Sequence, residues 1–410
     1  MLAQPPQPPS RLAPYLLLGL IWPLALVGLW PFIWWVTHLS AQHGAVTAPW
    51  RISDFAMFFA SGHAALSPEP GRVYIKHLLL AWEYRHVAGF HHVDPFVYPP
   101  PTLLLTAAVG AVGYWHAYLL WSAVLTLLSA IILRLARLPW WIIALTILSP
   151  AGLFSIMLGQ LGLLSGCCFI ASLLLIDTAP AVAGFLSALT IFKPQAALPA
   201  PIAIFARRRW SGVIAGLITV AALVLLSFIA FGPEIWRAYL RHGLASSGSL
   251  LTLPYPQPAF GPHYRGGFEY DEVSVFYMLR SLGLSLDAAI LGQVLCAIGA
   301  IMACCFIWRR EQGDYRLRIA ITIFLGLLVT PYGFTQDMVG FSGAILLVIW
   351  QRGYLTISDV LLMIWPALIG ASSAVLGVSL TPLVVLWAAR RANAALRQDR
   401  IFTPDVSVAP

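Results

Sequence analysis

The chain has 410 residues, of which 60% are hydrophobic and only 10% are charged. Soluble domains have about half of their residues apolar and about a quarter charged, so this composition excludes an ordinary soluble globular protein. Although 24 basic residues outnumber 16 acidic ones, they stand in short clusters at the ends of apolar runs, which is typical of cytoplasmic loops rather than of nucleic-acid binding.

Apolar runs near 16–35, 119–133, 213–230 and 360–389 approach or exceed the roughly 20 residues that cross a bilayer as a helix. About 11 to 13 apolar segments in total predict an all-α polytopic membrane protein. We expect one integral domain over 15–389, between a flexible cytoplasmic tail at 1–14 and a cytoplasmic tail at 390–410. No cleavage site follows the first apolar run, which is therefore expected to be a retained helix.

Arginine clusters at 207–209, 309–318, 352 and 390–400 predict the cytoplasmic ends of the later spans. These spans are expected at 211–231, 287–308, 317–332, 337–351, 355–370 and 371–389, alternately outward and inward, with the C-terminus inside.

The short segment 98–113 leaves two alternatives for the topology of the first half. A full span there places Arg134 and Arg137 outside, whereas a partly inserted helix, which we favour, places them inside.

Two long polar segments, 38–98 and 232–286, interrupt the apolar pattern. Long loops in a compact fold are usually functional, so we expect recognition and chemistry on the extracytoplasmic face. The first segment contains seven of the ten histidines and two stretches, near 52–67 and 77–90, with apolar residues at helical spacing. They predict amphipathic helices that lie in the membrane interface.

Asp54 opens the first of these stretches. An acid at this place is either a helix-start residue favoured by the helix dipole or a general base at the membrane surface. Position along the chain leaves both interpretations open.

Lys193 interrupts the apolar run 181–206 and is followed by Pro194. A charged residue inside a membrane segment is costly and often marks a substrate site, and the proline breaks the helix. An ammonium at such a break could bind a phosphate as a point charge. The alternative is a lysine that extends its stem to reach the interface.

Three further polar residues stand at breaks in apolar segments. Asp337 ends the motif PYGFTQD and is either a capped interfacial turn or part of a site. Gln160, in LGQLG, could bond a neighbouring helix or line a pocket. Tyr98 begins the motif YPPP, where prolines in a first helical turn are a sufficient structural explanation.

Arg265 and Arg280 lie near three acids, at 269, 271 and 272, and could either bind a phosphate or form a solvated salt-bridge cluster.

The group His91, His92 and Asp94 lacks the spaced partners of a metal site, so we expect no metal. The five cysteines lie in apolar stretches and indicate buried hydrophobic residues rather than disulfides. No phosphate-binding glycine loop or serine esterase motif is present.

Taken in order, several motifs resemble those of glycosyltransferase family 87, whose members are polytopic GT-C enzymes that use polyprenyl-phosphate-linked sugars. The motifs are DF with ASGHAAL, VYPPPTLLL, LGQLGLL, ALTIFKPQAALP with RRRW, FGPEIWRAYL, EVSVFYMLRSLG and TPYGFTQDMVGF. They extend from residue 54 to about residue 345. The chain differs from the family at Thr335 and Gln336, where an acid and an aromatic residue or histidine are frequent, and at Leu158 and Leu161 around the Gly-Gln pair.

The resemblance implies a role for each matching residue. Asp54 would be the base that deprotonates the acceptor hydroxyl, and Lys193 would bind the donor phosphate, with help from Arg265 and Arg280. The substrate pocket would include Tyr98, Gln160, Gln195 and Asp337.

We therefore expect a membrane glycosyltransferase that moves a hexose, mannose-like or related, from a polyprenyl-phosphate donor to a lipid or glycan hydroxyl by an inverting displacement. The expected location is the outer face of a bacterial-type inner membrane. Its partners would be the bilayer, the donor and a glycolipid or glycan acceptor, without nucleic acid, metal or cofactor. The alternatives are a transporter or flippase of polyprenyl-linked glycans and an inactive relative.

Overall fold

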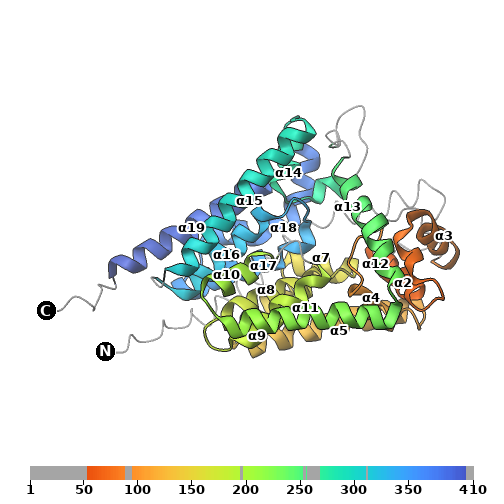
Figure 1. Cartoon of the computed structure of the whole chain (residues 1–410). Helices are drawn as coiled ribbons and strands as arrows, with labels where there is room; N and C mark the ends of the chain where they lie inside the picture. Colours follow the sequence, from red (N-terminus) through yellow and green to blue (C-terminus); the bar gives the residue numbers. More distant parts are fainter. Residues whose placement is uncertain are drawn as a thin grey trace.

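The computed structural model of the chain describes residues 53–87, 95–193, 197–252, 255, 268–310 and 313–402. Within these ranges the fold is helical, and an isolated antiparallel bridge joins Glu272 to Phe334. Figure 1 shows helices from the whole sequence packed into one bundle. The first half comprises α2 (Ser53–Ala65), η1 (Pro70–Tyr74), α3 (Lys76–His86), α4 (Thr102–Val109), α5 (Tyr114–Leu135), α6 (Trp140–Ile147), α7 (Pro150–Leu158), α8 (Gly162–Leu175), α9 (Pro180–Leu189) and η2 (Thr190–Phe192).

The second half begins with α10 (Pro199–Ala206) and α11 (Trp210–Phe231). It continues through α12 (Glu234–Ala238), η4 (Tyr239–Gly243), α13 (Leu244–Leu251), η5 (Phe268–Asp271), α14 (Val275–Ser281), α15 (Leu286–Arg309), α16 (Tyr315–Val329), η6 (Thr335–Met338), α17 (Val339–Arg352), α18 (Ile357–Leu376) and α19 (Thr381–Phe402). The expected first span near 16–35 lies outside the described residues.

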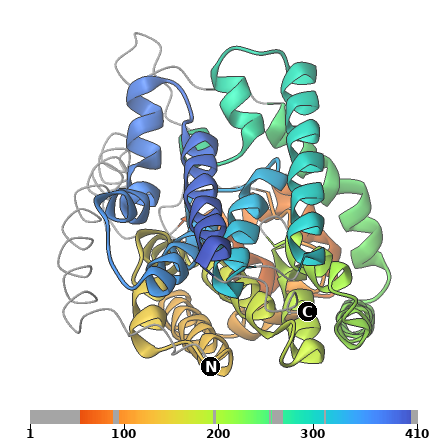
Figure 2. The same cartoon turned by 90° about the vertical axis from the view of Figure 1, so that its left-hand side faces the viewer.

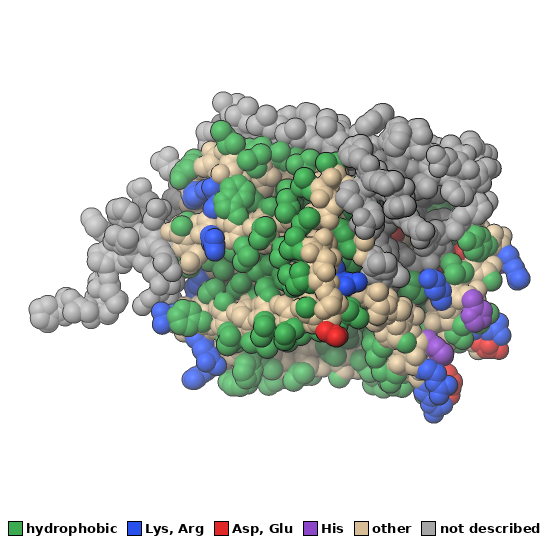
Figure 3. All heavy atoms as spheres, turned by 90° about the horizontal axis from the view of Figure 1, so that it is seen from above, with side chains coloured by type: hydrophobic (Ala, Val, Ile, Leu, Met, Phe, Trp, Pro, Cys, Tyr) green, Lys and Arg blue, Asp and Glu red, His purple; other side chains and the backbone are tan. Residues whose placement is uncertain are grey.

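Four described helices, α5, α11, α15 and α18, are long and apolar enough to cross a membrane, and α6 with α7 forms a further pair bent by 56°. In Figure 2, α11 lies at the edge of the bundle, and most of its leucine and isoleucine side chains are exposed. The described part of the face in Figure 3 is largely hydrophobic, with charged side chains at both ends and a few near the middle. The shorter helices α16 and α17 are almost wholly buried. This arrangement confirms an all-α polytopic membrane protein.

The helices α11, α15, α16 and α17 begin and end near the bounds of the expected spans, whereas α18 and α19 differ from them. Pro366 lies inside α18 without ending it. The helix continues to Leu376 and ends at Gly377, whose φ of 69° only glycine adopts readily. Consequently the expected boundary at 370 is wrong. In the same way, α19 runs to Phe402, so much of the expected tail at 390–410 is helical.

The segment 98–113 forms only α4, which has 8 residues. At 1.5 Å per residue it is about 12 Å long, well short of the roughly 30 Å hydrocarbon core of a bilayer. The structure therefore favours the partly inserted helix over a full span. The crossing is made by α5, a helix of 22 residues that carries Arg134 in its last turn.

Both helices expected in the first polar segment are present, as α2 and α3. However, Phe55 and Phe58 of α2 are each 0% exposed and pack against protein aromatics such as Trp121. Its apolar face is therefore covered by protein rather than by lipid headgroups. In contrast, α3 leaves Tyr84 half exposed, as expected for a helix at the surface.

Helices α8 to α10 run back and forth and place Lys193 at a turn. Asp177, after α8, forms ion pairs with Arg207 and Arg209 at 3.0 and 2.7 Å. From this arginine-rich end, the apolar helix Pro180–Phe192 rises about 20 Å at 1.5 Å per residue. Lys193 consequently lies at the opposite end of this helix from the arginines.

Candidate active site

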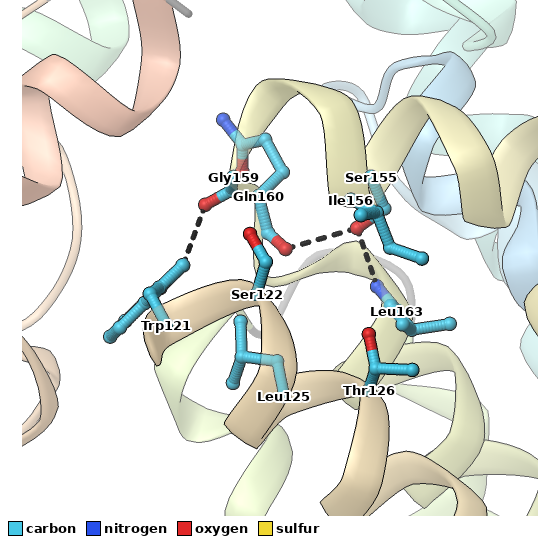
Figure 4. Close-up of a pocket in the computed structure, with 9 residues that line it drawn as sticks. All are labelled: Trp121, Ser122, Leu125, Thr126, Ser155, Ile156, Gly159, Gln160 and Leu163. Carbon is cyan, nitrogen blue, oxygen red and sulfur yellow. Dashed lines mark hydrogen bonds between the residues drawn. The ribbon is translucent and has the colours of Figure 1, made fainter. Parts of the chain in front are cut away.

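Gln160 lies in the tight turn between α7 and α8. Gly159 permits this turn because it adopts the left-handed conformation, with φ of 66°. Trp121 Nε1 donates to the Gly159 carbonyl at 2.8 Å, and Ser155 Oγ donates to the Gln160 carbonyl at 3.0 Å. Figure 4 shows these bonds around a shallow depression beside α5, with the Gln160 amide pointing away from the depression. The turn therefore fixes the direction of the amide.

The Gln160 amide connects three side chains from distant parts of the sequence. Its Nε2 donates to Asp54 Oδ2 at 2.8 Å. Its Oε1 accepts from Tyr98 Oη at 3.0 Å and from Lys193 Nζ at 3.2 Å. Because two donors meet Oε1, the orientation of the amide is determined, and the N–H group must face Asp54.

Lys193 forms a buried ion pair with Asp337. The Nζ atom lies 2.6 Å from Asp337 Oδ1, and the two side chains are 4% and 2% exposed. Asp337 Oδ2 also accepts from the backbone N–H of Phe334 at 3.1 Å. Asp337 is thus both the cap of η6 and the counter-ion of the lysine, so the two sequence interpretations are compatible.

Close backbone contacts hold these segments together. A β-carbon at Gly162 would lie 2.1 Å from the carbonyl oxygen of Gln336, and one at Gly159 would lie 2.7 Å from Cβ of Phe55. The absence of side chains at these glycines lets η6 approach α8 and lets α2 approach the turn at Gln160.

Tyr98 stands where the first polar segment meets α4. Its carbonyl accepts from Tyr74 Oη at 2.9 Å, and its ring lies 5.0 Å from that of Phe58. Burial raises the pKa of Tyr98 to about 12, so the phenol remains protonated and donates to Gln160 at neutral pH.

The structure thus brings together five predicted site residues, Asp54, Tyr98, Gln160, Lys193 and Asp337. Arg280 is placed elsewhere, because its Nη1 donates to the Leu284 carbonyl after α14 at 2.9 Å. Arg265 and Gln195 lie outside the described residues, as do His91, His92 and Asp94. Within the described ranges, no group of three or more His, Cys, Asp or Glu side chains could hold a metal ion.

Asp271 is a site residue that sequence reasoning did not single out. Burial, together with the nearby charge of Asp54, raises the pKa of Asp271 to about 7. Thr335 Oγ1 donates to its carbonyl at 3.4 Å. Its neighbour Glu272 is fully buried and accepts from the Gly333 N–H at 3.2 Å. Glu272 is therefore buried rather than solvated, whereas Arg265 and the side chain of Glu269, which belong to the expected cluster, lie outside the described residues.

The site combines one buried cation with several carboxyl groups inside an apolar bundle. Comparison with known families matches residues 96–331 to the model of glycosyltransferase family 87. The chain belongs to glycosyltransferase family 87. The matched range contains Tyr98, Gln160 and Lys193, whereas Asp54 and Asp337 lie beyond its two ends and join the site through the fold.

Membership in family 87 identifies a multi-pass membrane glycosyltransferase, which acts on glycan or lipid substrates. Searches of curated proteins and of solved structures returned no significant match.

Proposed function

We propose that this family 87 enzyme transfers a hexose, of mannose type or closely related, from a polyprenyl-phosphate donor to a hydroxyl of a lipid or glycan acceptor. The observation that carries the proposal is the chain of contacts from Asp54 through Gln160 to Lys193. It sets a carboxylate and a buried ammonium on opposite sides of one fixed amide. These two groups are suited to the two ends of a glycosyl transfer.

Lys193 would bind the donor phosphate. An ammonium has three N–H donors, and the described residues engage two, through Gln160 and Asp337. The third can donate to a phosphate oxygen. Negative charge grows on this phosphate as the glycosidic bond breaks, so a cation already in place stabilises the transition state more than the bound donor.

Asp54 would act as the general base. The acceptor oxygen attacks the anomeric carbon, the bond from that carbon to the phosphate oxygen breaks, and the hydroxyl proton passes to Asp54. The polyprenyl phosphate leaves with the bonding electron pair, and the anomeric centre inverts. The N–H of Gln160 supports this role because a hydrogen bond to a carboxylate favours its ionised form.

We further propose that the site opens to the outer face of a bacterial-type inner membrane. Support comes from the arginines that form ion pairs with Asp177 and Asp359. These arginines would mark the cytoplasmic end of the bundle. In a variant without its five cysteines, Leu66→Cys should react with an impermeant maleimide on intact spheroplasts, and Tyr354→Cys only after lysis. Both native side chains are more than half exposed. The opposite labelling pattern would overturn the orientation.

Transfer can be tested with the purified full chain in nanodiscs. Synthetic polyprenyl-phosphate mannose, glucose and galactose are each offered with extracted membrane lipids, and mass spectrometry detects hexose addition. NMR of the product reports the anomeric configuration.

Asp54→Asn should reduce the rate of transfer by at least about 100-fold, the scale of general base catalysis. The matched control Asp287→Asn changes an exposed acid at the start of α15 and should leave the rate unchanged. Equal rates for both variants would overturn the role of Asp54, and absence of transfer from every donor would overturn the proposed chemistry.

A further inference from the structure

A second carboxyl group, that of Asp271, faces the same site from the polar segment between α13 and α14. It is only partly buried, and it has no hydrogen bond or ion pair with the described side chains. Its position is nevertheless well defined. The bridge between Glu272 and Phe334 and the bond from Val273 N to the Gly333 carbonyl at 2.9 Å join this segment to the turn that carries Asp337.

The wall behind Asp271 is formed by α18. A β-carbon at Gly370 would lie 2.6 Å from Asp271 Oδ1, so the carboxyl group rests directly against the helix backbone. The stretch of α18 from 366 to 376 contains no ionisable residue. A carboxyl group held in this way, with no hydrogen bond or ion pair to the side chains that the structure describes, is available to a bound substrate.

The charges around Asp271 are predominantly negative. From α2 it meets Asp54, and from η6 the nearest acid is Asp337, which is already neutralised by Lys193. Its own neighbour Glu272 bonds to the Gly333 N–H. With Asp271 neutral, the site carries one negative charge fewer than with Asp271 ionised. The additional negative charge of an ionised Asp271 would repel an anionic donor.

We propose that Asp271 is a positioning residue of the transfer site, which binds the phosphate-linked sugar donor in its protonated form and opposes it when ionised. The inference rests on the proposed function. As a protonated acid, Asp271 donates a hydrogen bond to a sugar hydroxyl or phosphate oxygen of the donor. Asp54 is then the carboxylate that remains ionised to act as base, since two adjacent carboxyl groups do not readily ionise together.

The sign of the pH dependence follows from the raised pKa of about 7. Below this value Asp271 is neutral, and above it the site gains a negative charge. For a donor that binds only the neutral form, KM should rise roughly tenfold between pH 6 and pH 8. The acceptor KM and kcat should change much less, because the acceptor hydroxyl is uncharged.

The test is the donor KM as a function of pH for the wild-type enzyme, Asp271→Asn and Asp287→Asn. Asparagine keeps the shape and donor capacity of the neutral acid, so Asp271→Asn should hold the donor KM constant from pH 6 to 8, with kcat within about threefold. The exposed control Asp287→Asn should keep the wild-type rise. Thermal unfolding would verify that the variants are folded.

Two results would overturn the inference. One is a wild-type donor KM that does not change over this pH range, a measurement that requires no variant. The other is a folded Asp271→Asn enzyme that retains the full rise. Complete absence of transfer by the wild-type enzyme would instead contradict the proposed function, so the two failures are distinguishable.

Discussion

The ammonium of Lys193 and the carboxylate of Asp337 lie 2.6 Å apart with almost no solvent exposure, and each depends on the other for its charge to be tolerated. A buried ion pair contributes little net stability, whereas one partner left alone is strongly destabilising. Their contribution to folding can therefore be separated from their contribution to transfer.

Lys193→Met should lower the free energy of unfolding by about 3–5 kcal/mol, because Asp337 then becomes a buried charge without its counter-ion. The double variant Lys193→Met/Asp337→Asn should recover most of this loss, since no charge remains and asparagine can still accept from the Phe334 N–H. Neither variant should transfer sugar. Thermal unfolding in detergent and the transfer assay check both statements. Additive destabilisation in the double variant would contradict the coupling.

Gln160→Leu should shift the acid limb of the rate profile to higher pH. Loss of the N–H donated to Asp54 removes a bond to the ionised carboxylate, so its pKa rises and the base is protonated at a higher pH than in the wild type. The matched control is Gln293→Leu, which removes another buried amide, bonded to Phe276 N and to the Leu328 carbonyl. It should cost stability without moving the limb. An unshifted limb in Gln160→Leu would show that the amide does not influence the base.

Gly162→Ala should disturb the site without removing any of its groups. The added methyl would lie 2.1 Å from the Gln336 carbonyl oxygen, so η6 must move and carry Asp337 with it. We expect a loss of about 1–3 kcal/mol in stability, in line with other overpacked cores, and at least a tenfold loss of rate. Gly299→Ala, in the middle of α15 with no atom within 4 Å of the new methyl, should be neutral or stabilising by up to about 1 kcal/mol. Similar effects in the two variants would contradict the close-contact explanation.

Asp359→Asn should destabilise the enzyme while leaving its substrate constants unchanged. Asp359 is 1% exposed, pairs with Arg352 and Arg391, and accepts from the backbone N–H of Thr356 at the start of α18. Removal of its charge leaves two arginines without their partner, for an expected cost of about 3 kcal/mol. Thermal unfolding and donor KM should be measured together. A changed donor KM would imply that this end of α18 communicates with Asp271 at the other.

Five of the residues that the sequence singled out lie together in the structure, but their contacts with one another were not predictable. Asp54 was recognisable because it opens a helical stretch in the first polar segment. Lys193 and Asp337 were recognisable because an isolated charge in an apolar run is costly and needs a reason. Their pairing was not predictable, since periodicity carries no information about which distant turns meet. The importance of Gln160 was also not predictable, because an amide has no charge that would make it stand out in an apolar run.

Asp271 escaped notice because it is surrounded in sequence by other acids and by Arg265 and Arg280. A cluster of opposite charges normally indicates a solvated surface. Its burial depends on α18 and on the bridge to Phe334, which are tertiary features. The error in the boundary of α18 is of a different kind, because the apolar run gave no sign that the helix continues past 370 to Gly377.

The distance along the chain between Lys193 and Asp337 also matters during synthesis. Asp337 follows Lys193 by 144 residues, which corresponds to roughly 7–30 s at 5–20 residues per second. Throughout this interval the nascent chain contains Lys193 but not its counter-ion. We therefore expect the ammonium of Lys193 to stay at the polar interface, or to pair with a lipid phosphate, until η6 is made.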